Sequence, residues 1–282
     1  MRQSIPHNRG FAAGQPLTRA QFISKVPEVI TILFWIAKLL STALGESTSD
    51  YLVFGIDKYV AVGIGFVGLV VALILQLSAR RYNAWIYWLA VVMVAVFGTM
   101  AADVLHIVIL TPALHSASKA YLVATVFFAA CLAFIFMWWY LVEKTLSIHS
   151  IYTLRRELFY WATVVTTFAL GTAAGDFTAY TLHLGYFVSA LLFIALILVP
   201  AAGFVLFRLN AIAAFWVAYI LTRPIGASFA DLFGKPTTVT PPGRGLGDGP
   251  VAAVLTIAII IIVGYFAVSR KDMAGDTAQL GR

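Results

Sequence analysis

Long apolar stretches recur along the chain, separated by short polar connections. Each is close to the roughly 20 residues that a helix needs to cross a bilayer. They predict eight transmembrane helices, over residues 27–46, 59–79, 84–110, 121–143, 157–183, 186–208, 211–231 and 250–269. The odd-numbered helices carry Gly, Asp, Thr and Ser, whereas the even-numbered ones are almost wholly apolar. Because polar groups in a bilayer face protein or water, we expect the odd helices inside and the even ones towards lipid.

One pattern occurs four times, always in an odd-numbered helix: an aromatic residue, Trp, nine residues, Gly, four residues and Asp. The copies are Phe34-Trp35…Gly45…Asp50, Tyr87-Trp88…Gly98…Asp103, Tyr160-Trp161…Gly171…Asp176 and Phe215-Trp216…Gly226…Asp231. The constant spacing indicates an internal fourfold repeat. The predicted repeats cover residues 27–80, 81–144, 145–208 and 209–270, between cytoplasmic tails at 1–26 and 271–282.

Charge sets the expected orientation. The chain has 19 Lys and Arg residues. Thirteen lie in the two tails or beside the connections that follow even-numbered spans, four lie on the opposite side of the membrane, and two fall inside spans. By the positive-inside rule, both termini are cytoplasmic. Each repeat holds two spans, so all four enter the membrane in the same direction. We therefore predict an all-α polytopic membrane protein whose parallel repeats surround a pseudo-twofold, approximately fourfold axis along the membrane normal.

Composition narrows the class of protein. Hydrophobic residues make up 61% of the chain and charged ones 11%, far from the values of a soluble domain. The single cysteine, Cys131, excludes an intrachain disulfide and a zinc-thiolate cluster. The net charge of +7 follows from the positive-inside distribution and does not indicate nucleic acid. No catalytic triad, His-Glu-x-x-His motif or nucleotide loop is present, so we expect neither an enzyme nor a covalently bound cofactor.

Each repeat places one carboxylate towards the outer side of the membrane. At 100° per residue, four further polar side chains lie near these aspartates on their helix faces, if the helices continue: Glu46 and Asp57 with Asp50, His106 with Asp103, and His183 with Asp176. We expect a vestibule in the outer half of the membrane, ringed by Asp50, Asp103, Asp176 and Asp231. An ionisable residue inside a membrane is a functional-site hypothesis by default.

Carboxylates that share one cavity repel each other, so they need either protons or a bound cation. Oxygen ligands suit Mg²⁺, Ca²⁺ or Mn²⁺, and an added imidazole shifts the preference towards Mn²⁺ or a later transition metal. The predicted metal ligands are Asp50, Asp103, Asp176, Asp231, Glu46, His106 and His183. A structural alternative stays open: each Asp caps a helix end at the outer interface.

Two basic residues inside spans also need partners. Lys38 lies in the cytoplasmic half of the first span, from where its side chain can reach towards water. Arg223 lies deeper, and Pro224 after it removes a backbone donor and predicts a kink. A buried Arg near acidic residues indicates an internal ion pair, either as a fixed tie between helices or as a gate.

Several segments carry a family resemblance. They are the four repeat copies, GESTSDYL at 45–52, SIHSIYTLRRELFYW at 147–161 and FALGTAAGDF at 168–177. These resemble the bacterial membrane proteins built of four tandem two-span repeats of unknown function, often described as uncharacterised membrane-anchored proteins. The resemblance covers about residues 25 to 270. It implies eight spans in a bacterial inner membrane and no established activity.

The residues favour a transporter for a divalent metal cation, Mn²⁺-like and open to proton coupling, with the lipid bilayer and a small cation as partners. Two other classes stay open. One is a proton-linked carrier or channel for another solute, with Arg223 facing an anion. The other is a non-transporting sensor or scaffold. The sequence leaves a homo-oligomer open as well.

Overall fold

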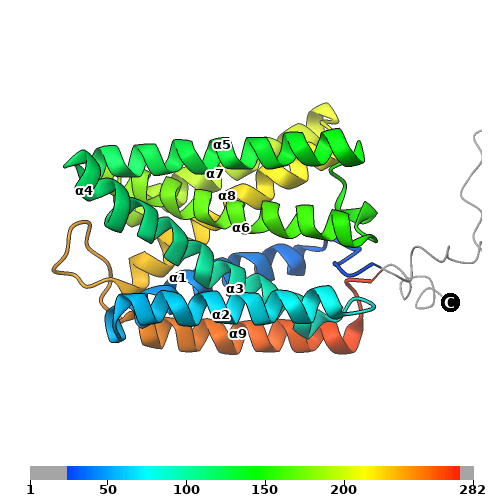
Figure 1. The fold of residues 1–282 in the computed structure, drawn as a ribbon, viewed down its shortest axis with the longest axis horizontal. Coiled ribbons are helices and arrows are strands. Elements are labelled where there is room, and N and C mark those ends of the chain that lie inside the picture. The colour runs from blue at the N-terminus through cyan, green and yellow to red at the C-terminus, as the bar shows by residue number, and fades with distance from the viewer. Residues whose placement is uncertain (1–23, 274–282) are drawn as a thin grey trace, which may run out of the picture.

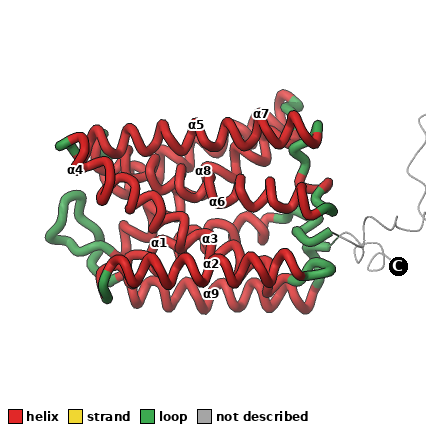
Figure 2. The backbone as a smooth tube through the Cα atoms, in the orientation of Figure 1, coloured by secondary structure: helices red, strands yellow, loops and turns green. Residues whose placement is uncertain are grey.

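The computed structural model describes residues 24–273, and every regular element in this range is a helix (Figures 1 and 2). The longer helices run roughly along the long axis of the molecule (Figure 1). The elements in chain order are α1 (Ile32–Gly55), α2 (Lys58–Ser78), α3 (Ala84–Asp103), the π-helix η1 (Val104–Leu110), α4 (Thr111–Leu114), α5 (Ala117–Glu143), the 3₁₀ turn η2 (Ile148–Ser150), α6 (Leu154–Asp176), the π-helix η3 (Phe177–Thr181), α7 (Gly185–Phe207), α8 (Ala211–Gly234) and α9 (Asp248–Ser269).

Four helices form an inner ring, which we call the helix ring: α1 packs on α3, α3 on α6, α6 on α8, and α8 on α1. The other four long helices lie outside it, with α2 against α3, α5 against α6, α7 against α8 and α9 against α1. In Figure 1, α5 and α7 form one edge of the molecule, and α2 and α9 form the opposite edge. The helices predicted to be odd-numbered are thus the inner ones, because their polar residues need protein partners.

Within residues 24–273, seven helical segments are long and apolar enough to cross a membrane. They are Lys58–Ser78, Ala84–Leu114, Ala117–Glu143, Leu154–Thr181, Gly185–Phe207, Ala211–Gly234 and Asp248–Ser269. The chain is therefore a multi-pass membrane protein. The remaining long helix, α1, has 24 residues and carries Lys38, Glu46 and Asp50.

Aromatic residues of the repeat join neighbouring helices of the ring. In every copy, the aromatic residue before the Trp contacts the Trp of the next copy, and the fourth copy contacts the first. The ring-centroid distances are 5.7 Å for Phe34–Trp88, 5.8 Å for Tyr87–Trp161, 6.2 Å for Tyr160–Trp216 and 5.7 Å for Phe215–Trp35. Tilted aromatic pairs at such distances are favourable. The motif's Trp and its aromatic neighbour are therefore packing residues.

The repeated glycines make the second set of contacts between neighbouring ring helices. An added Cβ at each would overlap the residue that lies three positions before the glycine of the next copy. The pairs are Gly45 with Ala95, Gly98 with Phe168, Gly171 with Arg223 and Gly226 with Thr42. The missing side chain lets the helices approach closely, as small residues do between transmembrane helices.

Seven of the predicted spans end within a few residues of the observed helices, but the first was wrong. It was predicted over 27–46, and the helix runs from Ile32 to Gly55. The Thr31 hydroxyl accepts a hydrogen bond from the Phe34 amide at 3.3 Å and caps the start. The helix continues past Glu46 because Arg223 and Lys235 pair with the buried carboxylates of Glu46 and Asp50.

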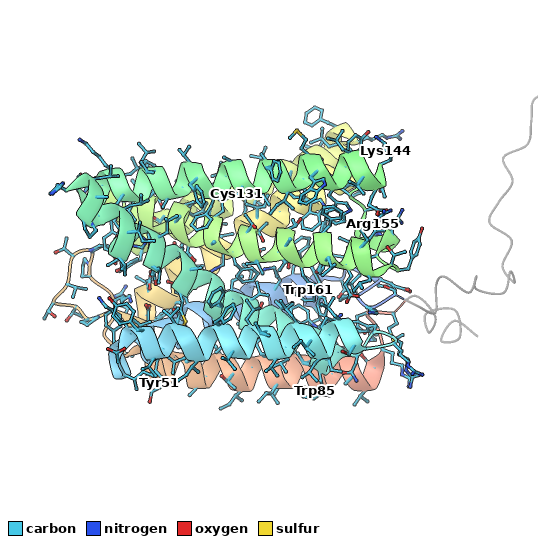
Figure 3. The ribbon with its side chains drawn as sticks, viewed as in Figure 1. Tyr51, Trp85, Cys131, Lys144, Arg155 and Trp161 are labelled. Atoms are coloured by element: carbon cyan, nitrogen blue, oxygen red, sulfur yellow. The ribbon has the colours of Figure 1, made fainter. Side chains whose placement is uncertain are left out.

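The segments from both ends of the described chain meet at one end of the bundle. Asp272 accepts hydrogen bonds from the amides of Glu28 and Val29 at 2.9 and 3.1 Å. Glu157 accepts from Lys25 at 2.8 Å and from Gln76 at 3.2 Å. Lys144 and Arg155 also lie at this end (Figure 3). The connection between α8 and α9 forms the large loop at the opposite end (Figure 1).

Candidate functional site

A buried ion pair joins α1 to α8 inside the helix ring. The Arg223 guanidinium donates to Glu46 Oε2 at 2.5 Å, to Thr172 Oγ1 at 2.7 Å and to the Thr42 carbonyl oxygen at 3.2 Å. It also donates to the Thr99 hydroxyl, which lies 3.2 Å from the same Glu46 oxygen. The predicted internal ion pair of Arg223 therefore exists, with Glu46 rather than with an aspartate. Arg223 is completely buried, and its contacts reach all four helices of the ring.

Glu46 belongs to a group of carboxylates at the end of the helix ring near the α8–α9 loop. One oxygen each from Glu46, Asp50 and Asp231 lies within 4.8 Å of the others. Lys235, directly after α8, places its ammonium 2.6 Å from Asp50 and 3.8 Å from Asp231. We call Glu46, Asp50 and Asp231 the paired group, because Arg223 and Lys235 compensate it.

A second group contains the remaining two aspartates of the repeat. Ligand atoms of Asp103, His106 and Asp176 lie within 4.8 Å of one another. Among the described residues, neither carboxylate forms an ion pair with Lys or Arg, and the close basic side chain is the imidazole of His106, whose Nδ1 lies 3.8 Å from Asp103. We call this the unpaired group. Its carboxylates are partly exposed, whereas His106 is buried.

Local backbone structure orients the unpaired group. Both aspartates end an α-helix and are followed directly by a π-helical segment, η1 after Asp103 and η3 after Asp176. Short π segments are frequent at functional sites. His106 Nδ1 lies 3.0 Å from the Ala102 carbonyl oxygen, which in a neutral imidazole fixes the proton there and leaves Nε2 unprotonated. The Tyr121 ring packs on His106 with centroids 4.4 Å apart.

The four repeated aspartates converge in these two groups, and neither Asp103 nor Asp176 caps the helix that follows it. The alternative in which each Asp only anchors its own helix end is therefore not what the structure shows. Asp248, at the start of α9, adds a partly buried carboxylate. Its Oδ1 packs against Gly234 at the end of α8, where an added Cβ would overlap it. Six carboxyl groups thus gather at this end against two basic residues, Arg223 and Lys235.

Two of the expected alignments fail. His183 was predicted to share the face of Asp176, but η3 changes the helical register. The chain then turns at His183, which has a φ of 55° and an exposed side chain. His183 belongs to neither group. Asp57 does not continue the face of Asp50, because α1 ends at Gly55 and the Asp57 carboxylate caps α2 by accepting from the Tyr59 amide at 2.9 Å.

Lys38 does not reach towards water as predicted. Its side chain is buried in the helix ring, and its ammonium nitrogen has no hydrogen-bond partner in the structure of residues 24–273. It lies 3.8 Å from the centroid of the Phe168 ring and 4.1 Å from that of Tyr219. Ring faces attract cations, and they replace the water that the side chain would otherwise find.

Sequence reasoning missed Lys235 and the two threonines. Lys235 follows Asp231 by four residues, one helical turn, and this spacing is the signal for an ion pair on a helix. Thr99 and Thr172 occupy the position of Glu46 in the second and third repeats. A repeat position that holds one carboxylate and two hydroxyls was a signal that these side chains meet.

The four copies match a protein-family model described as Repeat of Unknown Function (DUF347), over residues 33–82, 86–145, 159–209 and 214–272. The chain belongs to this family. The resemblance drawn from the repeat motifs is thereby confirmed, and the DUF347 repeats contain the inner-ring helix and the outer helix that follows it. No curated protein and no solved structure shows a significant match to the chain.

Proposed function

We propose that this chain is a membrane transporter for a divalent metal cation, Mn²⁺-like in ligand preference, that binds at Asp103, His106 and Asp176. The observation that carries the proposal is the unpaired group itself: two carboxylates and an imidazole converge without a Lys or Arg partner among the described residues. Two carboxylates held together repel each other unless a proton or a cation lies between them.

The spacing of the group suits an ion. Ligand atoms about 2.0–2.6 Å from a divalent cation lie no more than roughly 4–5 Å from one another, and these atoms lie within 4.8 Å. Two oxygen ligands with one imidazole favour Mn²⁺ over Mg²⁺ and Ca²⁺. The paired group is a weaker candidate, because the charges of Arg223 and Lys235 already oppose its carboxylates.

The architecture supports transport along the helix ring. We infer that α1 is an eighth span, held in the membrane by its buried polar contacts, and that the cyclic aromatic and glycine contacts reflect an approximately fourfold axis along the membrane normal. The distribution of Lys and Arg supports cytoplasmic termini in a bacterial inner membrane. In this orientation both acidic groups open towards the outer side.

One observation favours a second function, a proton-linked carrier for an anionic solute. Arg223 and Lys38 are both buried inside the helix ring, beyond the carboxylates from the outer side. Two positive charges on the axis would repel a metal ion on a straight path. The first proposal therefore requires rearrangement of the ring during transport, and the second does not.

Calorimetric titration of the purified protein with MnCl₂ tests the proposal. We expect one site, and a loss of affinity of at least about tenfold in Asp103→Asn and Asp176→Asn, since even outer-shell partners of a metal contribute that much. Asp57→Asn is the matched control: it makes the same chemical change on the same side of the protein, and Asn still caps α2.

Uptake by proteoliposomes that contain a Mn²⁺-sensitive dye completes the test. Wild-type vesicles should take up Mn²⁺, and the Asp103 and Asp176 variants should not. Absence of Mn²⁺, Mg²⁺ and Ca²⁺ binding in the wild type would remove the metal proposal. If the wild type instead takes up an organic or inorganic anion in a manner that depends on the pH gradient, the second function takes its place.

A further inference from the structure

The ammonium of Lys38 occupies an aromatic cage inside the helix ring. The cage consists of Phe168 from α6 and Tyr219 from α8, with centroids 3.8 and 4.1 Å from the nitrogen. Lys38 is 1% exposed and, in the part of the chain that the structure describes, donates no hydrogen bond. A buried ammonium without hydrogen bonds is held only by the ring faces, which replace part of the hydration that burial removes.

The position of Lys38 places it below the acidic groups. It lies eight residues before Glu46 on α1, which corresponds to about 12 Å along the helix towards the end where the described termini meet. The Glu46–Arg223 pair lies between Lys38 and the aspartates along the ring. The Arg223 guanidinium carbon lies 5.6 Å from the centroid of the same Phe168 ring. One aromatic ring therefore contacts both buried cations.

The groups that face Lys38 set its charge balance. From α8 these are Tyr219 and Arg223, and from α6 it is the uncharged Phe168. Arg223, whose guanidinium carbon lies over the same Phe168 ring as the Lys38 ammonium, carries a charge of the same sign. Movement of the Arg223 side chain would therefore change the stability of the Lys38 ammonium directly. A metal ion bound at Asp103 and Asp176 adds positive charge at the acidic end of the ring, repels the Arg223 guanidinium and favours such a movement.

Buried tyrosine hydroxyls also lie among the ring helices, towards the end where the described termini meet. Tyr87 and Tyr160 are buried and exchange a hydrogen bond of 2.6 Å between α3 and α6. The Tyr87 ring lies 5.8 Å from that of Tyr82, whose hydroxyl donates to Asp272 at 2.5 Å. Hydroxyls both accept and donate protons, so these tyrosines are polar groups that a proton can use on the side of Lys38 away from the carboxylates.

We propose that Lys38 is the proton-carrying group that couples metal movement to a pH gradient. The proposal rests on the proposed metal transport. The amine accepts a proton when the carboxylates release their cation, and returns it when they bind the next one. Methionine at this position cannot carry a charge, and arginine stays charged. Lys38→Met and Lys38→Arg should therefore both remove the coupling. This requirement separates a proton carrier from a structural cation.

The test uses proteoliposomes whose lumen is one pH unit more acidic than the outside, with the voltage held at zero by potassium and valinomycin. Wild-type vesicles should accumulate Mn²⁺ about tenfold for each proton exchanged, because a tenfold gradient corresponds to about 1.4 kcal/mol. Lys38→Met and Lys38→Arg should bring the accumulation ratio down to about one while Mn²⁺ binding by calorimetry persists. That persistence also shows that these variants fold.

Lys58→Met is the matched control, because Lys58 is an exposed lysine whose ammonium also lies over a ring, 5.2 Å from the centroid of Tyr59. It should keep the full accumulation. In Lys38→Ala, added propylamine should restore accumulation by filling the cage, and propanol, which has the same shape without the amine, should not.

The outcomes separate the two proposals. Full accumulation in Lys38→Arg or Lys38→Met overturns the role of Lys38 and leaves metal transport standing. Wild-type vesicles that admit Mn²⁺ without accumulating it would also overturn the role of Lys38 and leave metal transport standing. Wild-type protein that neither binds nor moves Mn²⁺ removes the proposed function and the proton coupling with it.

Discussion

Arg223 donates a 2.5 Å hydrogen bond to Glu46 across 177 positions of sequence, and both side chains are buried. Glu46 belongs to the first repeat and Arg223 to the last, so the pair closes the helix ring between α8 and α1. Each of the two residues is unique at its position among the repeats. The pair therefore adds a specific connection to a ring that is otherwise joined by repeated contacts.

Removal of one partner of the Glu46–Arg223 pair should lower the unfolding free energy much more than removal of both. Arg223→Met leaves the Glu46 carboxylate buried without its cation, and we expect a loss of about 3–5 kcal/mol in unfolding free energy. In the double variant Glu46→Met with Arg223→Met no charge is left unpaired. The Thr99 and Thr172 hydroxyls keep their helix carbonyls at 3.1 and 3.2 Å. We expect its stability close to that of the wild type.

Reversible unfolding in mixed detergent micelles measures both variants, with Lys58→Met as a control for loss of an exposed positive charge. A double variant as unstable as Arg223→Met would show that the guanidinium stabilises the ring through Thr42, Thr99 and Thr172 rather than by neutralising Glu46.

The sequence predicted the features that all four copies of the repeat share. An aromatic residue, a Gly and an Asp at constant spacing make the same contacts in every copy, and the odd helices are inner because they carry the polar residues. Residues that occur once were harder to place. The length of α1 depends on Arg223 and Lys235, which come from the far end of the chain, and no local pattern contains that information.

The alignment of His183 failed for a different reason. It assumed a continuous α-helix after Asp176, whereas η3 inserts a π segment and the chain turns at His183. A π segment arises where side-chain packing competes with the backbone ladder, and apolar periodicity does not reveal it. The same holds for Lys38, since the rings that surround it belong to α6 and α8.

The close approach of α8 to α1 at Gly226 should be sensitive to one methyl group. A Cβ there would overlap the Thr42 hydroxyl and lie 2.9 Å from the Ala43 nitrogen, which belongs to the backbone and has little room to move. We expect Gly226→Ala to cost about 1–3 kcal/mol, as overpacking does elsewhere. Thermal unfolding in detergent, followed by circular dichroism, measures the change.

Gly63 in α2 provides the matched control, because an added Cβ there meets nothing within 4 Å. Gly63→Ala should leave the protein unchanged or up to about 1 kcal/mol more stable, since Ala is the better helix former. Gly226→Ala as stable as Gly63→Ala would mean that the ring yields to the added methyl group and that packing at Gly226 does not limit stability.

Metal preference should depend on His106. The imidazole is the ligand in the unpaired group that favours Mn²⁺ over Mg²⁺. We expect His106→Asn to weaken Mn²⁺ binding while Mg²⁺ and Ca²⁺ binding changes little, so that the selectivity ratio falls. Competitive calorimetry with the three ions gives that ratio. An equal loss for all three ions would show that His106 supports the site through Ala102 and Tyr121 and does not contact the metal.

Lys235 acts as a tethered cation in the paired group. Burial acts to lower the pKa of its ammonium, but the charges of Asp231 and Asp50 outweigh burial and hold that pKa above its ordinary value. A raised pKa means that the stabilising contribution of Lys235 is fully present below the unfolded-state pKa, about 10.4. It is lost only as the pH rises through the higher folded-state value. Lys235→Met should therefore be less stable than the wild type throughout pH 7 to 9, as thermal unfolding in detergent measures.

The same substitution should open a second cation site. Without the ammonium 2.6 Å from Asp50, the oxygens of Glu46, Asp50 and Asp231 still converge within 4.8 Å, and a divalent ion replaces the lost positive charge. We expect calorimetry at pH 7 to give two Mn²⁺ per Lys235→Met chain and one per wild-type chain. Lys119→Met removes an exposed lysine at the start of α5 and should keep the wild-type value. A stoichiometry of one in Lys235→Met would mean that Arg223 alone is enough to keep a metal out of the paired group.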